Sequence, residues 1–197
     1  MTVAVLLFNN FETLDAFGPV EIFGRLTDQY QVSFYSLAGG LIGNAHGVSV
    51  MTKNLAEIEN GSDIFLIPGG YGTREEVNNA LLIDMIRKIS QQSKYVLTVC
   101  TGTSLLAKTG LLDGKNATSN KIAFDWVTTQ GPNVTWVRRA RWVVDGKYYT
   151  SSGVSAGMDM TLGFLENIHG IEFARNVART IEYNWQENKE EDSFCTQ

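Results

Sequence analysis

The 197-residue sequence predicts one α/β domain built on a mostly parallel sheet. Short apolar runs of the kind buried in a parallel sheet alternate with helical segments through the first half of the chain. The hydrophobic fraction of 44% is that of a globular protein, and the length suits one well-filled domain. No repeat or proline-rich linker interrupts the pattern, so we expect a single domain over residues 1–187 and an acidic tail over residues 188–197.

The first quarter of the chain begins with a continuous apolar run, Val3–Phe8, which predicts a strand buried on both faces. After a polar turn, Phe17–Leu26 predicts a helix, because a proline near its start fits the first helical turn. Alternating residues over Gln31–Leu37 predict the next strand, which two glycines end. A further short strand, expected to be antiparallel, covers His46–Thr52.

The middle of the chain continues the alternation of strand and helix. Asp63–Ile67 is an apolar strand that Pro68-Gly69-Gly70 ends. One long helix is predicted over Arg74–Gln92, because apolar residues recur there at four-residue steps. Its expected buried stripe consists of Val77, Leu81, Met85 and Ile89. Tyr95–Val99 is the next strand, and Ser104–Lys108 begins another helix.

The last third of the chain predicts two further short strands, a hairpin and three helices. A helix is expected around Ile122–Gln130, with short strands near Val134–Trp136 and Trp142–Val144. The Asp-Gly pair at 145–146 is a hairpin turn signal that leads to a strand at Tyr148–Thr150. Helices at Ala156–Ile168 and Ile171–Trp185 complete the domain.

Charge and hydropathy exclude several classes of partner. The net charge is −5, but residues 186–197 contain four acidic side chains and one lysine, which leaves −2 for the rest. A nearly neutral body without a basic stripe argues against nucleic acid or an anionic membrane as a partner. No apolar run approaches the about 20 residues that a membrane span needs. We therefore expect a small-molecule partner.

Cysteine and histidine usage limits the chemistry further. Cys100 and Cys195 make no disulfide framework, and the N-terminus lacks the positive segment of a secretion signal. A cytoplasmic location with reduced thiols is the expectation. His46 and His169 lie far apart in the sequence, which argues against a transition-metal site, so no metal is expected.

Four segments whose residues could form a binding or catalytic site follow predicted strands. In open α/β sheets, ligands bind beyond the carboxyl ends of the strands, where the strand order reverses. We therefore expect these segments to converge there; they are Phe11–Asp15, Pro68-Gly69-Gly70, Cys100-Thr101-Gly102 and Thr150–Gly153.

Cys100 is the candidate nucleophile. A thiol at a sharp strand-to-helix turn is placed like the serine of a hydrolase nucleophile elbow, although Thr98 stands where that pattern has glycine. The helix that begins after Cys100 is expected to lower the thiol pKa, and the Thr101 N–H is expected to face an oxyanion. The alternative is a buried cysteine that merely closes an apolar strand. The residues alone leave the two interpretations evenly matched.

A carboxylate is the expected acid or base, because neither histidine lies near Cys100 in the sequence. Asp15 is the candidate. A carboxyl facing a thiolate would share a proton with it, so we expect the pKa of Asp15 to be raised. The alternative for Asp15 is helix capping, and Glu12 and Glu21 are rival carboxylates. Gly70 is a candidate second oxyanion donor, although a Pro-Gly-Gly segment is also a common strand terminator.

Taken together, these motifs resemble the DJ-1/PfpI superfamily, over roughly residues 3–185. The similarity rests on Leu14-Asp15-Ala16-Phe17-Gly18-Pro19, Pro68-Gly69-Gly70, Val99-Cys100-Thr101-Gly102 and Ser152–Gly157. The first of these, and Cys-Thr-Gly in place of Cys-His-Gly, are similar to the isonitrile hydratase-like branch. The resemblance implies a flavodoxin-like, class I glutamine amidotransferase-like three-layer sandwich. It also implies a homodimer that needs no metal or organic cofactor.

The resemblance assigns roles to individual residues. Cys100 would be the nucleophile, Asp15 the acid/base group, and Thr101 a neighbouring hydroxyl and backbone donor. Gly70 would be the other oxyanion donor. Gly69, Ser152 and Gly153 would bind substrate, and the Ser152–Gly157 segment would line the pocket.

The implied activity is that of a cofactor-independent cysteine enzyme acting on a small electrophile. Its most specific form is hydration of an isonitrile to an N-substituted formamide through a thioimidate on Cys100. One alternative is a glyoxalase-like lyase acting on 2-oxoaldehydes. Another is a non-catalytic binding or redox-sensing dimer, in which an exposed Cys100 of low pKa is oxidised. Protease activity is disfavoured because Thr101 replaces the family's histidine.

Overall fold

An eight-stranded sheet forms the centre of the computed structural model, which describes residues 1–58 and 60–195. Its strand order is β3-β4-β2-β1-β5-β6-β10-β9. The strands are β1 (Thr2–Leu6), β2 (Gln31–Ser36), β3 (Gly40–Gly43), β4 (Ser49–Asn54), β5 (Ile64–Ile67), β6 (Tyr95–Thr98), β9 (Trp142–Asp145) and β10 (Tyr148–Ser151). A separate pair is formed by β7 (Asn116–Ala117) and β8 (Thr135–Trp136).

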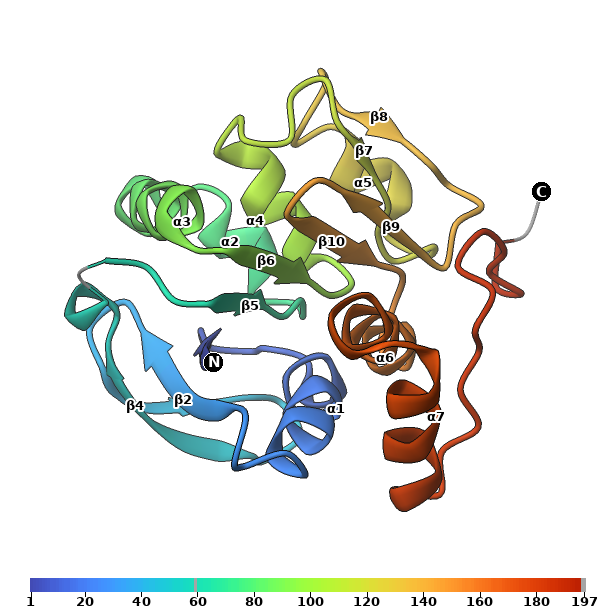
Figure 1. Cartoon of the computed structure of the whole chain (residues 1–197). Helices are drawn as coiled ribbons and strands as arrows, with labels where there is room; N and C mark the ends of the chain where they lie inside the picture. Colours follow the sequence, from blue (N-terminus) through green and yellow to red (C-terminus); the bar gives the residue numbers. More distant parts are fainter. Residues whose placement is uncertain (59, 196–197) are drawn as a thin grey trace.

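Helices cover both faces of this sheet (Figure 1). On one face α1 (Thr13–Gly24) packs against α6 (Ala156–His169), and α6 packs against α7 (Ile171–Thr180). On the other face α3 (Ala80–Gln92) and α2 (Thr73–Glu76) pack against α4 (Gly102–Lys108), which also contacts α5 (Phe124–Thr128). The predicted flavodoxin-like three-layer sandwich is therefore confirmed. No helix in the described part of the chain is long and apolar enough to cross a membrane.

The central strands pair in parallel, so their carboxyl ends meet at one edge of the sheet. Val5 of β1 lies opposite Leu66 of β5, and Leu66 lies opposite Leu97 of β6. These three side chains are fully buried, because helices cover both faces of each strand. The order reverses at β1, which has β2 on one side and β5 on the other. The loops after β1, β5, β6 and β10 therefore gather at a switch point where α/β proteins bind ligands.

The edges of the sheet differ from the prediction. The two glycines expected to end a strand instead lead into β3, which forms an antiparallel hairpin with β4. The strand expected at His46–Thr52 is β4, shifted to Ser49–Asn54. Its antiparallel pairing holds toward β3, but it pairs in parallel with β2. A four-residue strand next to a turn carries too short a pattern for the sequence to show it.

The single helix predicted over Arg74–Gln92 is wrong. It is divided into α2 and α3, because the Asn79 side chain accepts a hydrogen bond from the Leu82 N–H and so caps a new helix. The predicted stripe is correct at Val77 and Ile89, which are buried, but wrong at Leu81, which is 62% exposed, and Met85 is only partly buried. The buried face consists of Leu82, Ile83, Ile86, Ile89 and Ser90. A strict four-residue step drifts off the true face of a helix with 3.6 residues per turn.

Two other helices have boundaries that differ from those expected. Helix α1 begins at Thr13, four residues before the predicted start, so that Asp15 lies in its first turn. Helix α7 ends at Thr180 rather than at Trp185, and Glu182 just beyond it has a left-handed φ of 53°.

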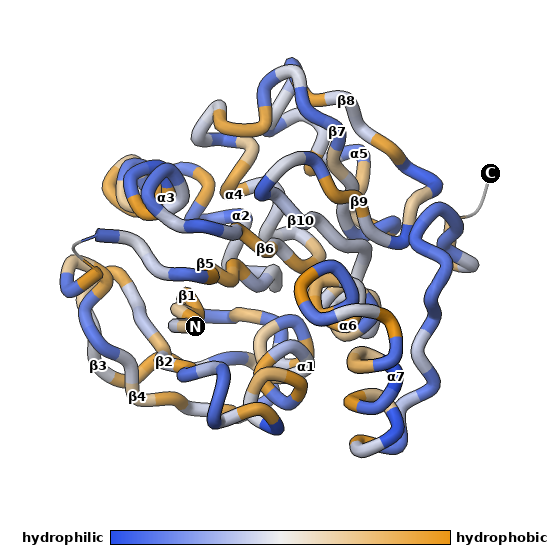
Figure 2. Tube along the Cα trace, viewed as in Figure 1, coloured by the Kyte–Doolittle hydropathy of each residue, from blue (hydrophilic) through white to orange (hydrophobic). Residues whose placement is uncertain are grey.

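The C-terminal segment over residues 186–195 lies along the outer edge strand β9 (Figure 1). It is mostly hydrophilic, as its colour in Figure 2 shows. The Lys189 carbonyl accepts a hydrogen bond of 2.8 Å from the Arg141 N–H. Asp192 is 5% exposed and forms ion pairs with Arg141 and Lys121. This part of the expected tail is therefore packed against the domain.

Candidate active site

Cys100 occupies the tight turn between β6 and α4. Its φ of 58° is left-handed, a conformation that costs a residue with a side chain about 1–3 kcal/mol. Two hydrogen bonds hold it there: its N–H donates to the Ser152 carbonyl at 3.1 Å, and the Ser119 hydroxyl donates to its carbonyl at 2.7 Å. The side chain is 6% exposed. Strain held in place by neighbouring contacts is typical of a nucleophile elbow and is unnecessary for a cysteine that only fills a core.

Asp15 is fully buried beside this thiol. The carboxyl comes from the first turn of α1, and its Oδ2 accepts a hydrogen bond of 2.9 Å from the Gly69 N–H. Its side chain also interacts with the Cys100 thiol, while Oδ1 has no nitrogen or oxygen partner among the described residues. The N-cap of α1 is Glu12, so helix capping does not explain Asp15. Its free oxygen is available to exchange a proton at the sulfur.

The electrostatics of the pair place the titrating proton on the carboxyl. Burial raises the pKa of Asp15 to about 7, and the charge of Glu12 adds to the increase, while the Gly69 N–H opposes it. Burial and the negative charge of Asp15 raise the pKa of the Cys100 thiol well above its ordinary value. The Thr101 N–H at the start of α4 donates to the sulfur but does not outweigh burial. The start of that helix thus lowers the thiol pKa as expected, but burial outweighs it, so the expectation of an exposed Cys100 of low pKa is wrong.

The loop after β5 links both groups. The Thr101 hydroxyl accepts a hydrogen bond of 3.0 Å from the Gly70 N–H. Gly69 has no room for a side chain, because a Cβ there would lie 2.6 Å from the Thr101 nitrogen and 2.8 Å from Asp15 Oδ2. Gly70 has a left-handed φ of 127°, which glycine adopts without strain. For Gly70 to serve as an oxyanion donor, its N–H must break the hydrogen bond to the Thr101 hydroxyl and donate to the substrate instead.

The segment after β10 packs against the turn that contains Cys100. Ser152 is buried and contributes its carbonyl to the Cys100 N–H rather than presenting an exposed hydroxyl. Gly153 packs against the Asn120 side chain. Val154 has a left-handed φ of 48°, and its N–H lies near enough to the Cys100 sulfur and the Asp15 carboxyl to lower the pKa of both groups. Two backbone N–H groups, those of Thr101 and Val154, thus stabilise negative charge at the sulfur.

Several residues around this site were not predicted. Ser119 and Asn120 come from a loop after β7, whose two-residue length leaves no sequence signal. Val154 lies in the Ser152–Gly157 segment that the resemblance placed at the pocket, but its own contribution comes from the backbone, which no side-chain pattern can indicate. Arg74, expected within a long exposed helix, lies close enough to Cys100 for the two charges to interact. A cation two residues after a Gly-rich turn was the signal available for it.

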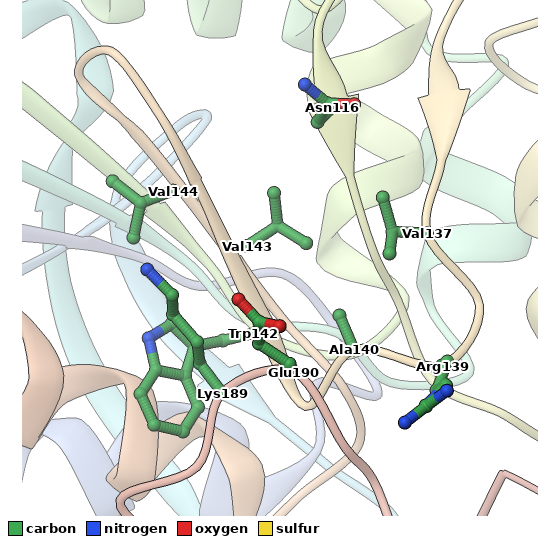
Figure 3. Close-up of a pocket in the computed structure, with 9 residues that line it drawn as sticks. All are labelled: Asn116, Val137, Arg139, Ala140, Trp142, Val143, Val144, Lys189 and Glu190. Carbon is green, nitrogen blue, oxygen red and sulfur yellow. The ribbon is translucent and has the colours of Figure 1, made fainter.

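A cavity elsewhere in the molecule shares no residue with this site. It has a volume of about 470 Å³ and lies between β9 and the C-terminal segment, with Trp142, Val143, Val144, Lys189 and Glu190 on its walls (Figure 3). Neither Cys100 nor Asp15 lines this cavity. The chemistry described above belongs to the Cys100 site.

Known proteins resemble this chain over nearly its whole length. It is 29% identical to the isonitrile hydratase of Pseudomonas putida over 185 residues, which cover 93% of this chain and 78% of that protein. It is 30% identical to the deglycase PH1704 of Pyrococcus horikoshii over 77% of this chain and 89% of that protein. The HTH-type transcriptional regulator CdhR of Pseudomonas aeruginosa is 28% identical over 84% of this chain. The matched region spans about half the length of that regulator.

The fold has solved counterparts. A THiJ/PfpI family protein from Pseudomonas syringae superposes with a TM-score of 0.85 over 94% of this chain and 76% of that one, at 24% identity. The DJ-1/PfpI family itself matches residues 1–167, which include every predicted site residue. Fold, sequence similarity and the order of the motifs agree, and the chain belongs to the DJ-1/PfpI family.

Proposed function

We propose that this protein is a cysteine enzyme that hydrates an isonitrile to an N-substituted formamide, with Cys100 as nucleophile and Asp15 as acid/base group. The observation that carries the proposal is the contact between the buried Asp15 carboxyl and the Cys100 thiol. A carboxyl whose pKa is about 7 both accepts and donates a proton at neutral pH. Similarity to an isonitrile hydratase supports the choice of substrate.

The first step attaches the substrate. The Cys100 sulfur forms a bond to the terminal isonitrile carbon, and the thiol proton passes through ionised Asp15 to that same carbon. The product is a thioimidate, in which the carbon bears sulfur, hydrogen and a double bond to nitrogen. The N–H groups of Thr101 and Val154 stabilise the sulfur while its proton is on the carboxyl.

The second step releases the product. Ionised Asp15 takes a proton from water, whose oxygen adds to the thioimidate carbon, and the nitrogen is protonated. The C–S bond of the tetrahedral adduct then breaks, its hydroxyl becomes the formamide carbonyl, and the hydroxyl proton returns to the Cys100 sulfur. The sum is the addition of one water, and nothing is oxidised or reduced. General acid/base help of this kind contributes about 10²–10⁴ in rate.

A parallel screen tests this function. Isonitriles and 2-oxoaldehydes are given to the wild-type protein, to Cys100→Ala and to Cys195→Ala. We expect formamide from wild type and Cys195→Ala, and none from Cys100→Ala with its fold intact. Undiminished turnover by Cys100→Ala, or no turnover of any isonitrile by wild type, rejects the proposal.

A second candidate is a lyase acting on 2-oxoaldehydes, in which Cys100 forms a hemithioacetal. Similarity to a deglycase favours it. Lactate formed from methylglyoxal in the same screen, without isonitrile loss, supports this reaction instead. Redox sensing has less support, because a thiol that is 6% exposed and has a raised pKa forms little accessible thiolate. A cytoplasmic homodimer that needs no metal or organic cofactor remains part of the proposal, and light scattering tests the dimer.

A further inference from the structure

Arg74 takes no part in the proposed hydration, yet hydrogen bonds connect it to the elbow. The Gly70 N–H donates to the Thr101 hydroxyl, and the Thr73 hydroxyl donates to the Gly70 carbonyl at 2.7 Å. Arg74 Nη1 in turn donates to the Thr73 hydroxyl at 3.4 Å. The guanidinium is thus connected through the loop after β5 to the residue next to Cys100.

An aromatic ring fixes the orientation of this side chain. The Arg74 guanidinium carbon lies 3.4 Å from the ring centroid of Trp126, which belongs to α5. A guanidinium stacked on an indole face gains cation–π energy and keeps its plane fixed. Stacking occupies the face of the group and leaves its edge N–H donors directed outward. These donors match the two oxygens of a carboxylate.

The charge of Arg74 is not neutralised in the way that other arginines are. Arg87, Arg138 and Arg175 each form an ion pair. Within residues 1–58 and 60–195, no carboxylate oxygen lies within 4.0 Å of an Arg74 nitrogen. Partial burial lowers the pKa of Arg74, while the negative charges of Cys100 and Tyr71 raise it. An arginine stays protonated in proteins, so the guanidinium is a cation near Cys100 without a carboxylate partner among the described residues.

We propose that Arg74 is a specificity-determining residue that binds a carboxylate on the electrophile while Cys100 attacks it. The enzyme then prefers isonitriles that carry a carboxylate, such as isocyanoacetate, to uncharged analogues of similar size. The nature of the electrophile rests on the proposed function, whereas the selection for an anion beside Cys100 does not.

Alkylation of Cys100 tests the selection without any turnover. Iodoacetate and iodoacetamide differ by a negative charge, and mass spectrometry of the Cys100 peptide gives each rate, with the Cys195 peptide as internal reference. We expect Arg74→Met to lower the ratio of the iodoacetate rate to the iodoacetamide rate about tenfold, the size of one charge-assisted hydrogen bond. Arg74→Lys is expected to lower this ratio less than Arg74→Met does. Arg179→Met, a control on α7, is expected to leave the ratio unchanged.

Two outcomes overturn the proposal. An unchanged ratio in Arg74→Met means that Arg74 binds no anion at this site. An equal loss of both rates means that it acts on the thiol itself. With isonitriles, we expect Arg74→Met to lower kcat/KM for isocyanoacetate about tenfold and for its ethyl ester less than twofold. If neither isonitrile is turned over, the proposed function fails while the alkylation ratio still decides the role of Arg74.

Discussion

The Gly69 N–H donates a hydrogen bond of 2.9 Å to Asp15 Oδ2 and so fixes a carboxyl from helix α1 against the loop that follows β5. Oδ1 of Asp15 has no hydrogen-bond partner within the described residues, and the carboxyl interacts with the Cys100 thiol. One oxygen therefore holds the carboxyl in place and the other is free for proton transfer. Substitutions at Asp15 and at Gly69 are therefore expected to have different effects.

Asp15→Asn keeps an oxygen for the Gly69 N–H and removes the negative charge next to Cys100. Since burial and that charge raise the pKa of the Cys100 thiol, we expect the variant to have a lower thiol pKa than wild type. The pH profile of iodoacetamide alkylation at Cys100 measures it, and its midpoint is expected to move to lower pH. Hydration is expected to fall about 10²–10⁴-fold despite the more reactive thiol. A midpoint that stays in place or rises contradicts the pairing.

The same variant tests the pH dependence of stability. The pKa of Asp15 is raised from 3.8 in the unfolded chain to about 7 in the folded one. The folded state therefore loses stability as pH rises from about 4 to 7, because only the unfolded chain ionises freely there. Relative to wild type, Asp15→Asn is expected to gain up to about 4 kcal/mol in free energy of unfolding across that interval. Urea denaturation at pH 4, 5.5 and 7.5 checks it, and a constant difference refutes it.

Gly69→Ala is expected to displace the parts of the site that Gly69 lets come together. Its Cβ would lie 2.6 Å from the Thr101 nitrogen and 2.8 Å from Asp15 Oδ2, so the loop must move. We expect a loss of stability of about 1–3 kcal/mol and a marked fall in activity. Gly24→Ala, at the end of α1 with no atom within 4 Å of its Cβ, is the matched control. It should be neutral or stabilising by up to about 1 kcal/mol. Equal effects at the two glycines would count against a close-packed site.

The sheet and most helices were predictable because long apolar runs leave few alternatives. Val3–Phe8, Asp63–Ile67 and Tyr95–Val99 are continuous enough to require burial on both faces, and each became a central strand. The break between α2 and α3 depends on one side-chain cap at Asn79, which competes with a helical pattern that continues through it. Strand β3 was missed because its exposed residues, such as Leu41, have no buried face to mark it.

The convergence of the candidate residues and the raised pKa of Asp15 were predictable from the sequence, whereas the raised pKa of Cys100 was not. Cys100, Asp15, Gly69 and Gly70 follow strands or begin helices, and parallel topology brings such positions together. The pKa values depend on how deeply the pair is buried, which only packing determines. Arg74 was missed because its place at the site arises from a helix break. Val154 lies in the expected Ser152–Gly157 segment, but its role was missed because it arises from a left-handed backbone.

Asp192 in the C-terminal segment is expected to be a major source of stability for that segment. Its carboxylate is 5% exposed, lies 3.3 Å from Arg141 Nη1 and is 3.9 Å from Lys121 Nζ. Removing one partner of a buried ion pair leaves an uncompensated charge, and such losses cost about 3–5 kcal/mol. We expect Asp192→Ala to be destabilised by about that amount and to be cleaved by trypsin near Lys189 faster than wild type. Glu191→Ala, which removes an exposed partner of Arg139, should change stability by less than about 1 kcal/mol. Equal protection of both variants from trypsin would mean that Asp192 does not hold the segment.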